Sequence, residues 1–158
     1  MSMADGVLDE RDLTLPGQDR FSKGPVAVIE CIEEIPCNPC VDACPRKAIS
    51  MRRVTGLPKL DADRCNGCGL CLSHCPGLAI FWIDESRVDL DRVGIPYELL
   101  PLPEPNEEVM LFDRAGGSCG KGRVDKIWNR PSQDRTAVVF VAVPKGLAMK
   151  VRHLRRIG

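Results

Sequence analysis

The sequence predicts an α+β fold in which two related units, each built of two strands and a short helix, precede a small antiparallel β-barrel-like module. Two features lead to this prediction: a cysteine-rich segment that repeats itself, and a series of β-rich runs near the end of the chain. Only 4% of the 158 residues are aromatic, which is little material for a large apolar core. Eight of the nine cysteines lie between Cys31 and Cys75. This density indicates that metal or disulfides help to hold the fold.

Residues 1–24 are expected to form an irregular N-terminal arm, because they combine many charges with Pro16 and Gly17 and show no clean periodicity. Residues 25–83 form the first predicted domain and contain an internal repeat. Six positions recur 31 residues later: Cys37, Cys40, Cys44, Pro45, Ala48 and Ile49 return as Cys68, Cys71, Cys75, Pro76, Ala79 and Ile80. The two halves are therefore expected to be related by a pseudo-twofold axis.

Each half has the pattern of a strand, a cysteine loop, a short helix and a second strand. The predicted strands lie at 26–29, 49–51, 57–60 and 80–83, and the predicted helices lie around 41–43 and 72–74. Thr55, Gly56 and Pro58 supply the turn between the halves.

Residues 84–108 are predicted to be a stiff, proline-rich connector, because each proline removes a backbone donor and favours extended geometry before it. Residues 109–158 are predicted to form the small β module, with strands at 109–112, 122–128 and 136–143 and a basic closing segment. The glycine-rich run at 115–122 lacks two residues of a phosphate-binding loop and is expected to be a hairpin turn, which leaves its Cys119 outside any site.

The second half of the repeat reads Cys65-x2-Cys68-x2-Cys71-x3-Cys75-Pro76. This run is typical of 4Fe-4S clusters: three closely spaced thiolates on a glycine-loosened loop bind one cube, and the fourth points into the other half. Two four-cysteine zinc sites are the alternative, and they rarely use three successive cysteines at this spacing. Disulfides would require an oxidising compartment.

On these motifs, residues 25–83 resemble the dicluster 2x[4Fe-4S] bacterial-type ferredoxin family. The resemblance implies a βαββαβ fold, low-potential electron transport and two [4Fe-4S] clusters whose fourth ligands are exchanged between the halves. The implied cofactor-binding and metal ligands are Cys31, Cys37, Cys40 and Cys75 for one cluster, and Cys65, Cys68, Cys71 and Cys44 for the other.

The first half departs from the family pattern. Cys31 lies three residues before Glu34, the position that the repeat would make a ligand, so a longer loop is expected between Cys31 and Cys37 if Cys31 binds. If Cys31 does not bind, Cys37, Cys40 and Cys75 would hold a three-iron cluster or a cluster with a labile fourth iron. Pro39 in this loop cannot donate an N–H group to a cluster sulfur, and such hydrogen bonds stabilise the reduced state. The cluster at Cys31 is therefore expected to have the lower reduction potential.

No catalytic motif and no flavin- or NAD-binding glycine loop is present. The first hypothesis is therefore a non-catalytic electron-transfer subunit of a larger oxidoreductase, in a hetero-oligomer whose catalytic flavoprotein carries FAD or FMN and oxidises amino acids or amines. The N-terminus lacks a signal-peptide pattern, and no apolar run could span a bilayer, so a cytoplasmic location without a membrane span is expected.

Two other hypotheses come from different classes of protein. A free, diffusing ferredoxin is one, although such carriers are usually strongly acidic and this chain has a net charge of zero. A nucleic-acid-associated protein with structural clusters is the other, suggested by the basic segment 114–158. No recognition motif accompanies that segment, so no nucleic-acid partner is expected. The segregation of acidic and basic residues along the chain indicates separate modules or two partner-facing surfaces.

Overall fold

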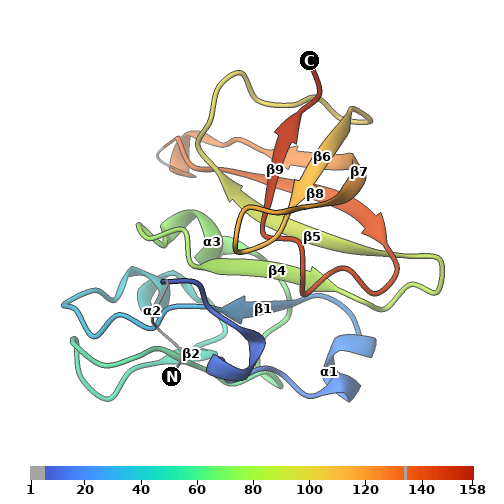
Figure 1. The fold of residues 1–158 in the computed structure, drawn as a ribbon. Coiled ribbons are helices and arrows are strands. Elements are labelled where there is room, and N and C mark those ends of the chain that lie inside the picture. The colour runs from blue at the N-terminus through green and yellow to red at the C-terminus, as the bar shows by residue number, and fades with distance from the viewer. Residues whose placement is uncertain (1–5, 134) are drawn as a thin grey trace.

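The computed structural model describes residues 6–133 and 135–158 (Figure 1). The described residues contain three short α-helices, two 3-10 helices and nine strands. Their bounds are 3-10 helix Glu10–Asp12, α1 Gln18–Ser22, β1 Val26–Ile29, α2 Pro39–Ala43, β2 Ile49–Ser50, β3 Lys59–Leu60, α3 Leu70–His74, β4 Ile80–Asp84, β5 Leu90–Tyr97, β6 Glu108–Phe112, β7 Ser118–Trp128, 3-10 helix Pro131–Gln133, β8 Ala137–Pro144 and β9 His153–Arg156.

The order β1-α2-β2-β3-α3-β4 confirms the predicted βαββαβ arrangement of the cysteine-rich repeat. The outer strands β1 and β4 pair antiparallel, with Ala27 opposite Trp82, and the inner strands β2 and β3 pair antiparallel, with Ile49 opposite Leu60. Helices α2 and α3 occupy equivalent places in the two halves and contact each other. The two halves are therefore joined at both their strands and their helices.

Both helices are short because their sequences begin and end them sharply. In α2, Pro39 stands in the first turn, where the missing N–H costs nothing. In α3, the preceding Gly69 adopts a left-handed conformation with φ 76°. The C-caps, Cys44 and Cys75, are extended and each precedes a proline, which disfavours a further helical turn. A cysteine therefore directly follows the end of each helix.

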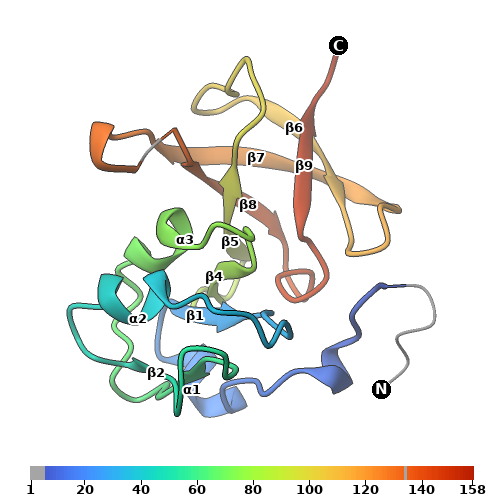
Figure 2. The ribbon, with the colours of Figure 1, turned by 90° about the vertical axis from the view of Figure 1, so that its left-hand side faces the viewer.

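The outer strands of the repeat, β1 and β4, continue into the C-terminal strands and form one antiparallel sheet of seven strands, in the order β1-β4-β5-β8-β7-β6-β9 (Figure 2). Strands β2 and β3 form a separate two-stranded sheet. Strand β5 joins the two parts, because it pairs with β4 on one side and with β8 on the other. Among the described residues β8 and β9 do not pair, so the strands beyond the repeat curl without closing. The predicted barrel-like module is therefore not closed, and its antiparallel strands belong to a large open sheet.

The segment predicted to be a connector, residues 84–108, contains all of strand β5. Sequence reasoning missed this strand because of Pro96, which is usually excluded from central strands. The pairing of β4 with β5 extends only to Gly94 at that end, so Pro96 lies beyond it and is opposite Val138 of β8 alone. The missing N–H therefore breaks no bond to β4.

The N-terminal segment is more regular than the expected irregular arm. Its first five residues lie outside the described part of the chain, and the rest includes the first 3-10 helix and α1. In the 3-10 helix, Asp9 and Asp12 form a reciprocal capping box. In α1, Phe21 is buried against the apolar core. The segment is thus held to the domain.

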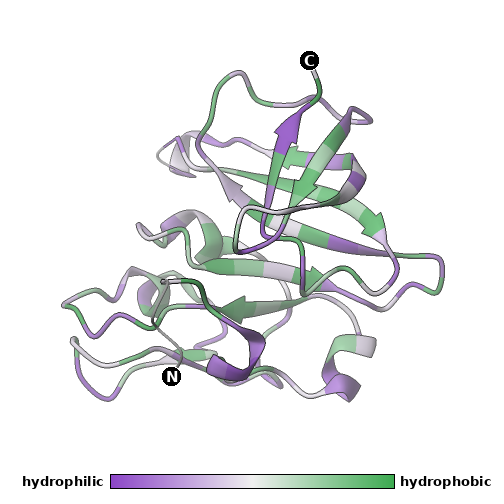
Figure 3. Ribbon diagram, viewed as in Figure 1, coloured by the Kyte–Doolittle hydropathy of each residue, from purple (hydrophilic) through white to green (hydrophobic). Residues whose placement is uncertain are grey.

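Apolar side chains gather along the central strands, which Figure 3 shows in green. On one face Trp82 and Phe140 pack with Leu72 of α3 and with the buried cysteines, and their rings meet edge to face with centroids 4.9 Å apart. The other face packs a larger group that includes Val93 and Val141. Each of the two cores therefore contains residues from the strands on both sides of β5.

Gly94 of β5 lies where the backbone approaches these rings most closely. A β-carbon there would lie 2.7 Å from Cβ of Trp82 and 3.0 Å from a ring carbon of Phe140. We expect Gly94→Ala to lower the free energy of unfolding by about 1–3 kcal/mol, because the core must shift to admit a methyl group. Urea unfolding would measure this. Gly17→Ala, where the added group meets open space, is the control, and equal losses would contradict the explanation.

Among the described residues, no helix is both long enough and apolar enough to cross a bilayer.

Candidate metal centres

The first cysteine group surrounds a cavity of about 310 Å³. Its lining includes four cysteines, namely Cys31, Cys37, Cys40 and Cys75. The first three follow β1 or belong to the first loop and α2, whereas Cys75 follows α3 in the other half of the repeat. Apolar residues such as Ile29 and Ile80 complete much of the wall. Cys31 thus lies with the other three cysteines despite its displaced position in the sequence.

The second group surrounds a smaller cavity of about 20 Å³. Its lining includes Cys44, Cys65, Cys68 and Cys71. Cys44 comes from the end of α2, and the other three come from the second loop and α3. The sequence predicts these same two groups of four, with one member of each exchanged between the halves. Cys119 lines neither of these cavities and lies in strand β7.

The four sulfurs of each group line a cavity rather than converging on one point. Among residues 6–133 and 135–158, no three His, Cys, Asp or Glu side chains are grouped as one metal ion would require. A [4Fe-4S] cube presents four separate irons to four thiolates, and this arrangement of donors suits it. The residues present therefore fit the cofactor that the sequence predicts.

The electrostatics of the thiols also reveal the two groups. Burial, followed by the nearby Cys75, Cys37 and Cys31, raises the pKa of Cys40 to about 11. Burial, followed by Cys65, Cys68 and Cys44, raises the pKa of Cys71 to about 12. Without a cation these thiols stay protonated at neutral pH, whereas a thiol that coordinates a metal loses its proton. The buried sites therefore favour thiolates only when they carry metal.

Backbone N–H groups point at three of the sulfurs. Ala48 donates to Sγ of Cys44 at 3.3 Å, and Ala79 donates to Sγ of Cys75 at 3.4 Å. These two bonds are equivalent in the repeat. Ala27 also donates to Sγ of Cys65, at 3.5 Å. The bond from Ala27 has no counterpart in the first group, because the repeat places Pro58 there, which has no N–H.

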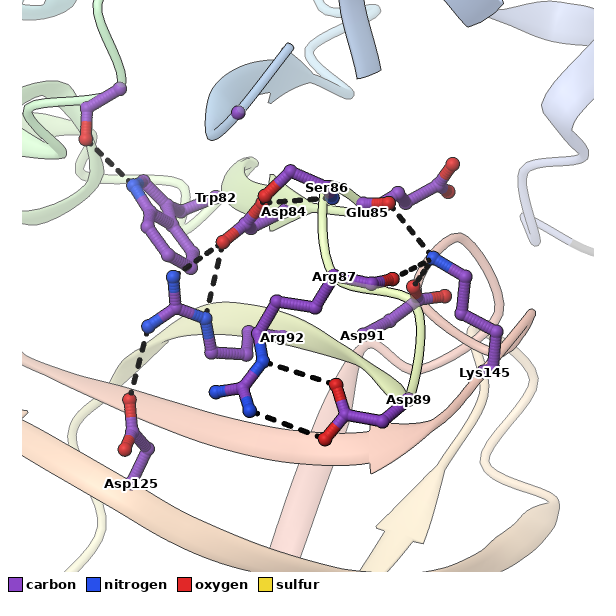
Figure 4. Close-up of polar contacts among 12 residues, drawn as sticks. Trp82, Asp84, Glu85, Ser86, Arg87, Asp89, Asp91, Arg92, Asp125 and Lys145 are labelled. Carbon is purple, nitrogen blue, oxygen red and sulfur yellow. Dashed lines mark hydrogen bonds and ion pairs between the residues drawn. The ribbon is translucent and has the colours of Figure 1, made fainter. Parts of the chain in front are cut away.

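The second cysteine loop is anchored to its surroundings from two sides. Arg20 of α1 donates to the carbonyl oxygens of Cys65 at 2.7 Å and of Pro25 at 2.8 Å. Trp82 donates its indole N–H to the carbonyl of Gly67 at 2.7 Å (Figure 4). Gly67 has φ 71°, and a β-carbon on it would lie 2.6 Å from the Pro25 carbonyl. Only glycine allows the loop to approach β1 so closely.

A buried ion triad joins the first cysteine group to the C-terminal part of the sheet. Glu30 immediately precedes Cys31, and its carboxylate accepts hydrogen bonds from Nε of Arg152 at 2.7 Å and from Nε of Arg114 at 3.1 and 3.2 Å. Burial lowers the pKa of Arg152, and the charge of Glu30 opposes this shift. Arg152 also lies over the Phe81 ring, 4.8 Å from its centroid. The two arginines exceed Glu30 by one positive charge.

Acidic and basic parts of the chain pair in other places too. Figure 4 shows Arg92 between the buried Asp84 and Asp125, and Lys145 beside the buried Asp91 at 2.8 Å. Part of the charge that is segregated along the sequence, interpreted above as a sign of separate modules or partner-facing surfaces, is therefore paired within the chain. This pairing fixes the β4–β5 turn against the end of β8.

Comparison with known families decides the nature of this site. Residues 30–79 match the 4Fe-4S dicluster domain family. These residues are a 4Fe-4S dicluster domain. The eight cysteines of the 31–75 region suit two [4Fe-4S] clusters. The family match therefore favours iron-sulfur clusters over the zinc and disulfide alternatives.

Curated relatives match within the same region. A Pyrococcus furiosus protein named as the polyferredoxin-like subunit of an aliphatic sulfonate oxidoreductase is 38% identical over 53 residues, which cover 34% of this chain and 28% of that protein. The ferredoxin-type protein NapF of Haemophilus influenzae is 40% identical over 52 residues, 31% of this chain and 30% of its own. A ferredoxin of Methanocaldococcus jannaschii is 37% identical over 67 residues, 41% of each chain.

The chain thus spans less than half the length of these relatives, and the similarity concerns the dicluster domain. A search of solved structures gave no significant match.

Sequence reasoning found all eight cysteines around the two cavities but missed the residues that anchor them. Glu30, Arg114 and Arg152 are far apart in the sequence and form no recognisable motif. Arg20 lies in the charged N-terminal segment, which has no motif that marks it out. The sequence did contain one signal for the ion triad, namely Glu30 next to Cys31, because a charged residue directly after a buried strand needs a partner.

Proposed function

We propose that this chain relays single electrons through two [4Fe-4S] clusters as a subunit of a larger oxidoreductase. The observation that carries the proposal is the pair of four-cysteine cavities within one dicluster domain, each lined by cysteines from both halves. A [4Fe-4S] cluster held by these cysteines would supply one-electron redox chemistry. The protein's part is to hold the two clusters close together and to set their potentials.

In this proposal Cys31, Cys37, Cys40 and Cys75 hold the first cluster, and Cys65, Cys68, Cys71 and Cys44 hold the second. The grouping of these cysteines around the cavities and their mutual electrostatic influence support the assignment.

Membership of a complex is supported by the extra structure around the domain. Strands β5 to β9 continue its sheet well beyond what the two cysteine sites require. One relative is named as a subunit of an oxidoreductase. We infer a hetero-oligomer in which a catalytic partner, a flavoprotein with FAD or FMN, performs the two-electron step and this chain passes the electrons on singly.

The test is anaerobic purification of the protein from its native source, followed by size-exclusion chromatography. We expect the brown iron-sulfur protein to elute together with a yellow flavin-containing chain. Iron analysis of this chain should give about eight irons, as two cubes require. A brown protein that elutes as a single chain would favour a free ferredoxin instead, and an iron content near one or two would overturn the cluster proposal.

The two clusters are expected to differ in reduction potential. The Cys31 cluster receives fewer N–H···S bonds, because Pro58 replaces Ala27 in the repeat, and each such bond stabilises the reduced form. The net positive charge of the Glu30 triad opposes this difference, so Arg114→Gln should widen it. We expect an anaerobic titration followed by electron paramagnetic resonance to show the Cys65 cluster reduced first.

Two variants make this titration decisive. Cys40→Ser changes the signal of the Cys31 cluster and so identifies it in the spectrum. Pro58→Ala restores the missing N–H and should raise the potential of that cluster alone. Reduction of the Cys31 cluster before the other would contradict the explanation.

A further inference from the structure

A second hollow opens beside the cavity of the first cysteine group. It has a volume of about 540 Å³, and its lining includes Arg52, Arg53 and Lys59, with Glu34 as the opposing charge. Gly56 lines both this hollow and the cysteine cavity, so the two are immediate neighbours. The loops that form the hollow project at the lower left of Figure 1, on the side away from the C-terminal strands. Positive charge therefore gathers next to one cluster site.

The three cations of this hollow have no partners within the described part of the chain. The side chains of Arg52, Arg53 and Lys59 make no hydrogen bond or ion pair there. Elsewhere acidic and basic side chains pair internally, as at Asp91 with Lys145. Even with Glu34 counted, the hollow keeps two positive charges. These charges are available for a partner.

Apolar side chains stand exposed around the same hollow. Ile35 is 51% exposed, Val54 is 52% exposed and Leu57 is 39% exposed. They lie on the loops 32–36 and 53–57, which border the cysteine cavity and the hollow. Exposed aliphatic groups mixed with arginine are typical of protein interfaces, where arginine is enriched relative to lysine and glutamate. A small anion would make no favourable contact with these aliphatic side chains.

The hollow is also directly connected to a cluster ligand. The N–H of Cys37 donates to the carbonyl of Val54 at 3.2 Å. A protein seated on Val54 and Leu57 would therefore be one hydrogen bond away from a thiolate of the first cluster. The second cysteine loop lies under Trp128 and α1 instead, because Gly69 is in close contact with the Trp128 ring and Arg20 spans the loop carbonyls.

We propose that Arg52, Arg53 and Lys59, with Ile35, Val54 and Leu57, form the docking surface for an acidic face of a redox partner protein, which exchanges electrons with the Cys31 cluster. The inference rests on the proposed electron-transfer function and specifies that the partner exchanges electrons at the Cys31 cluster. In each transfer the reduced cluster loses one electron and the partner's acceptor gains one, with any accompanying proton taken from solvent. Complementary charge would orient the partner before contact.

The test uses flavodoxin, an acidic FMN protein, as the probe. The Arg52→Glu/Arg53→Glu variant is compared with Lys150→Glu/Arg155→Glu, which makes the same change in net charge at exposed positions in the C-terminal part of the chain. Calorimetric titration of the oxidised proteins at low salt measures binding, and stopped-flow mixing of the dithionite-reduced protein measures electron transfer to FMN. Iron content and cluster potentials are checked first, because the proposed function predicts that both variants keep two active clusters.

We expect Arg52→Glu/Arg53→Glu to weaken binding and to slow electron transfer by at least about tenfold at low salt, and high salt to remove the difference. The Lys150→Glu/Arg155→Glu protein should change much less. Equal losses in both variants would show a net-charge effect only, and unchanged binding in both would show that the surface is not used. Either result overturns the docking surface while two intact clusters preserve the proposed function.

Discussion

Cys44→Ala is expected to remove the cluster of the opposite half of the repeat. Cys44 belongs to the first loop by sequence, but it lines the cavity of Cys65, Cys68 and Cys71. Without its thiolate one iron of that cube has no protein ligand, and the buried site is left open. Iron content should fall from about eight to about four per chain, and the signal that remains should be that of the Cys31 cluster.

The matched variants make the exchange of ligands visible. Cys75→Ala should have the mirror effect and leave the cluster at Cys65, although Cys75 lies in the second loop. Cys119→Ala should leave both clusters intact, because that thiol lines neither of these cavities. If Cys44→Ala removed the Cys31 cluster instead, the ligands would not be exchanged. The change in the spectrum under anaerobic conditions is the measurement.

Arg152→Met is expected to destabilise the protein strongly, although it removes no cysteine. The guanidinium is almost completely buried, with 4% of its side chain exposed, and its Nε donates to Glu30 at 2.7 Å. Removing one member of a buried ion pair strands the other charge, which typically costs about 3–5 kcal/mol. Arg114 still contacts Glu30, so we expect a loss near about 3 kcal/mol.

The measurement is the urea concentration at which the anaerobic protein loses its cluster absorbance. Arg156→Met is the control, because Arg156 pairs with Glu107 near the surface and exposed pairs contribute little. A similar midpoint for the two variants would show that the triad does not hold the C-terminal strands to the dicluster domain. The electron paramagnetic resonance titration of the Arg152→Met protein would also report the effect of the lost charge on the Cys31 cluster.

The dicluster domain could be read from the sequence because its constraints are local. The cysteine spacing and the repeat specify the loops, the two short helices and the four strands, and each of these elements is found in the structure. Even the displaced Cys31 lies beside Cys37, Cys40 and Cys75, since a longer loop bridges the extra residues. Metal chemistry restricts sequence far more than a general apolar core does.

The continuity of the sheet could not be read in this way. Strand β5 has Pro96 and Gly94, two residues that argue against a central strand, and only its neighbours explain them. Trp82 and Phe140 fill the space above Gly94, and the pairing of β5 with β4 ends at Gly94, before Pro96. The Glu30 triad was hidden for the same reason: Arg114 and Arg152 reach Glu30 only once the sheet has curled. Long-range contacts leave little trace in a single sequence.

The hydrogen bonds between β4 and β5 have a consequence for dividing the chain. A fragment cut after residue 84 would keep all eight cysteines around the two cavities, yet β4 would become an open edge with unpaired backbone groups. Trp82 would lose its contact with Phe140, and Glu30 would lose both of its partners, Arg114 and Arg152. Such a fragment would be prone to pair with other copies of itself. The shortest segment that contains all eight cysteines is therefore shorter than the shortest segment that folds stably by itself.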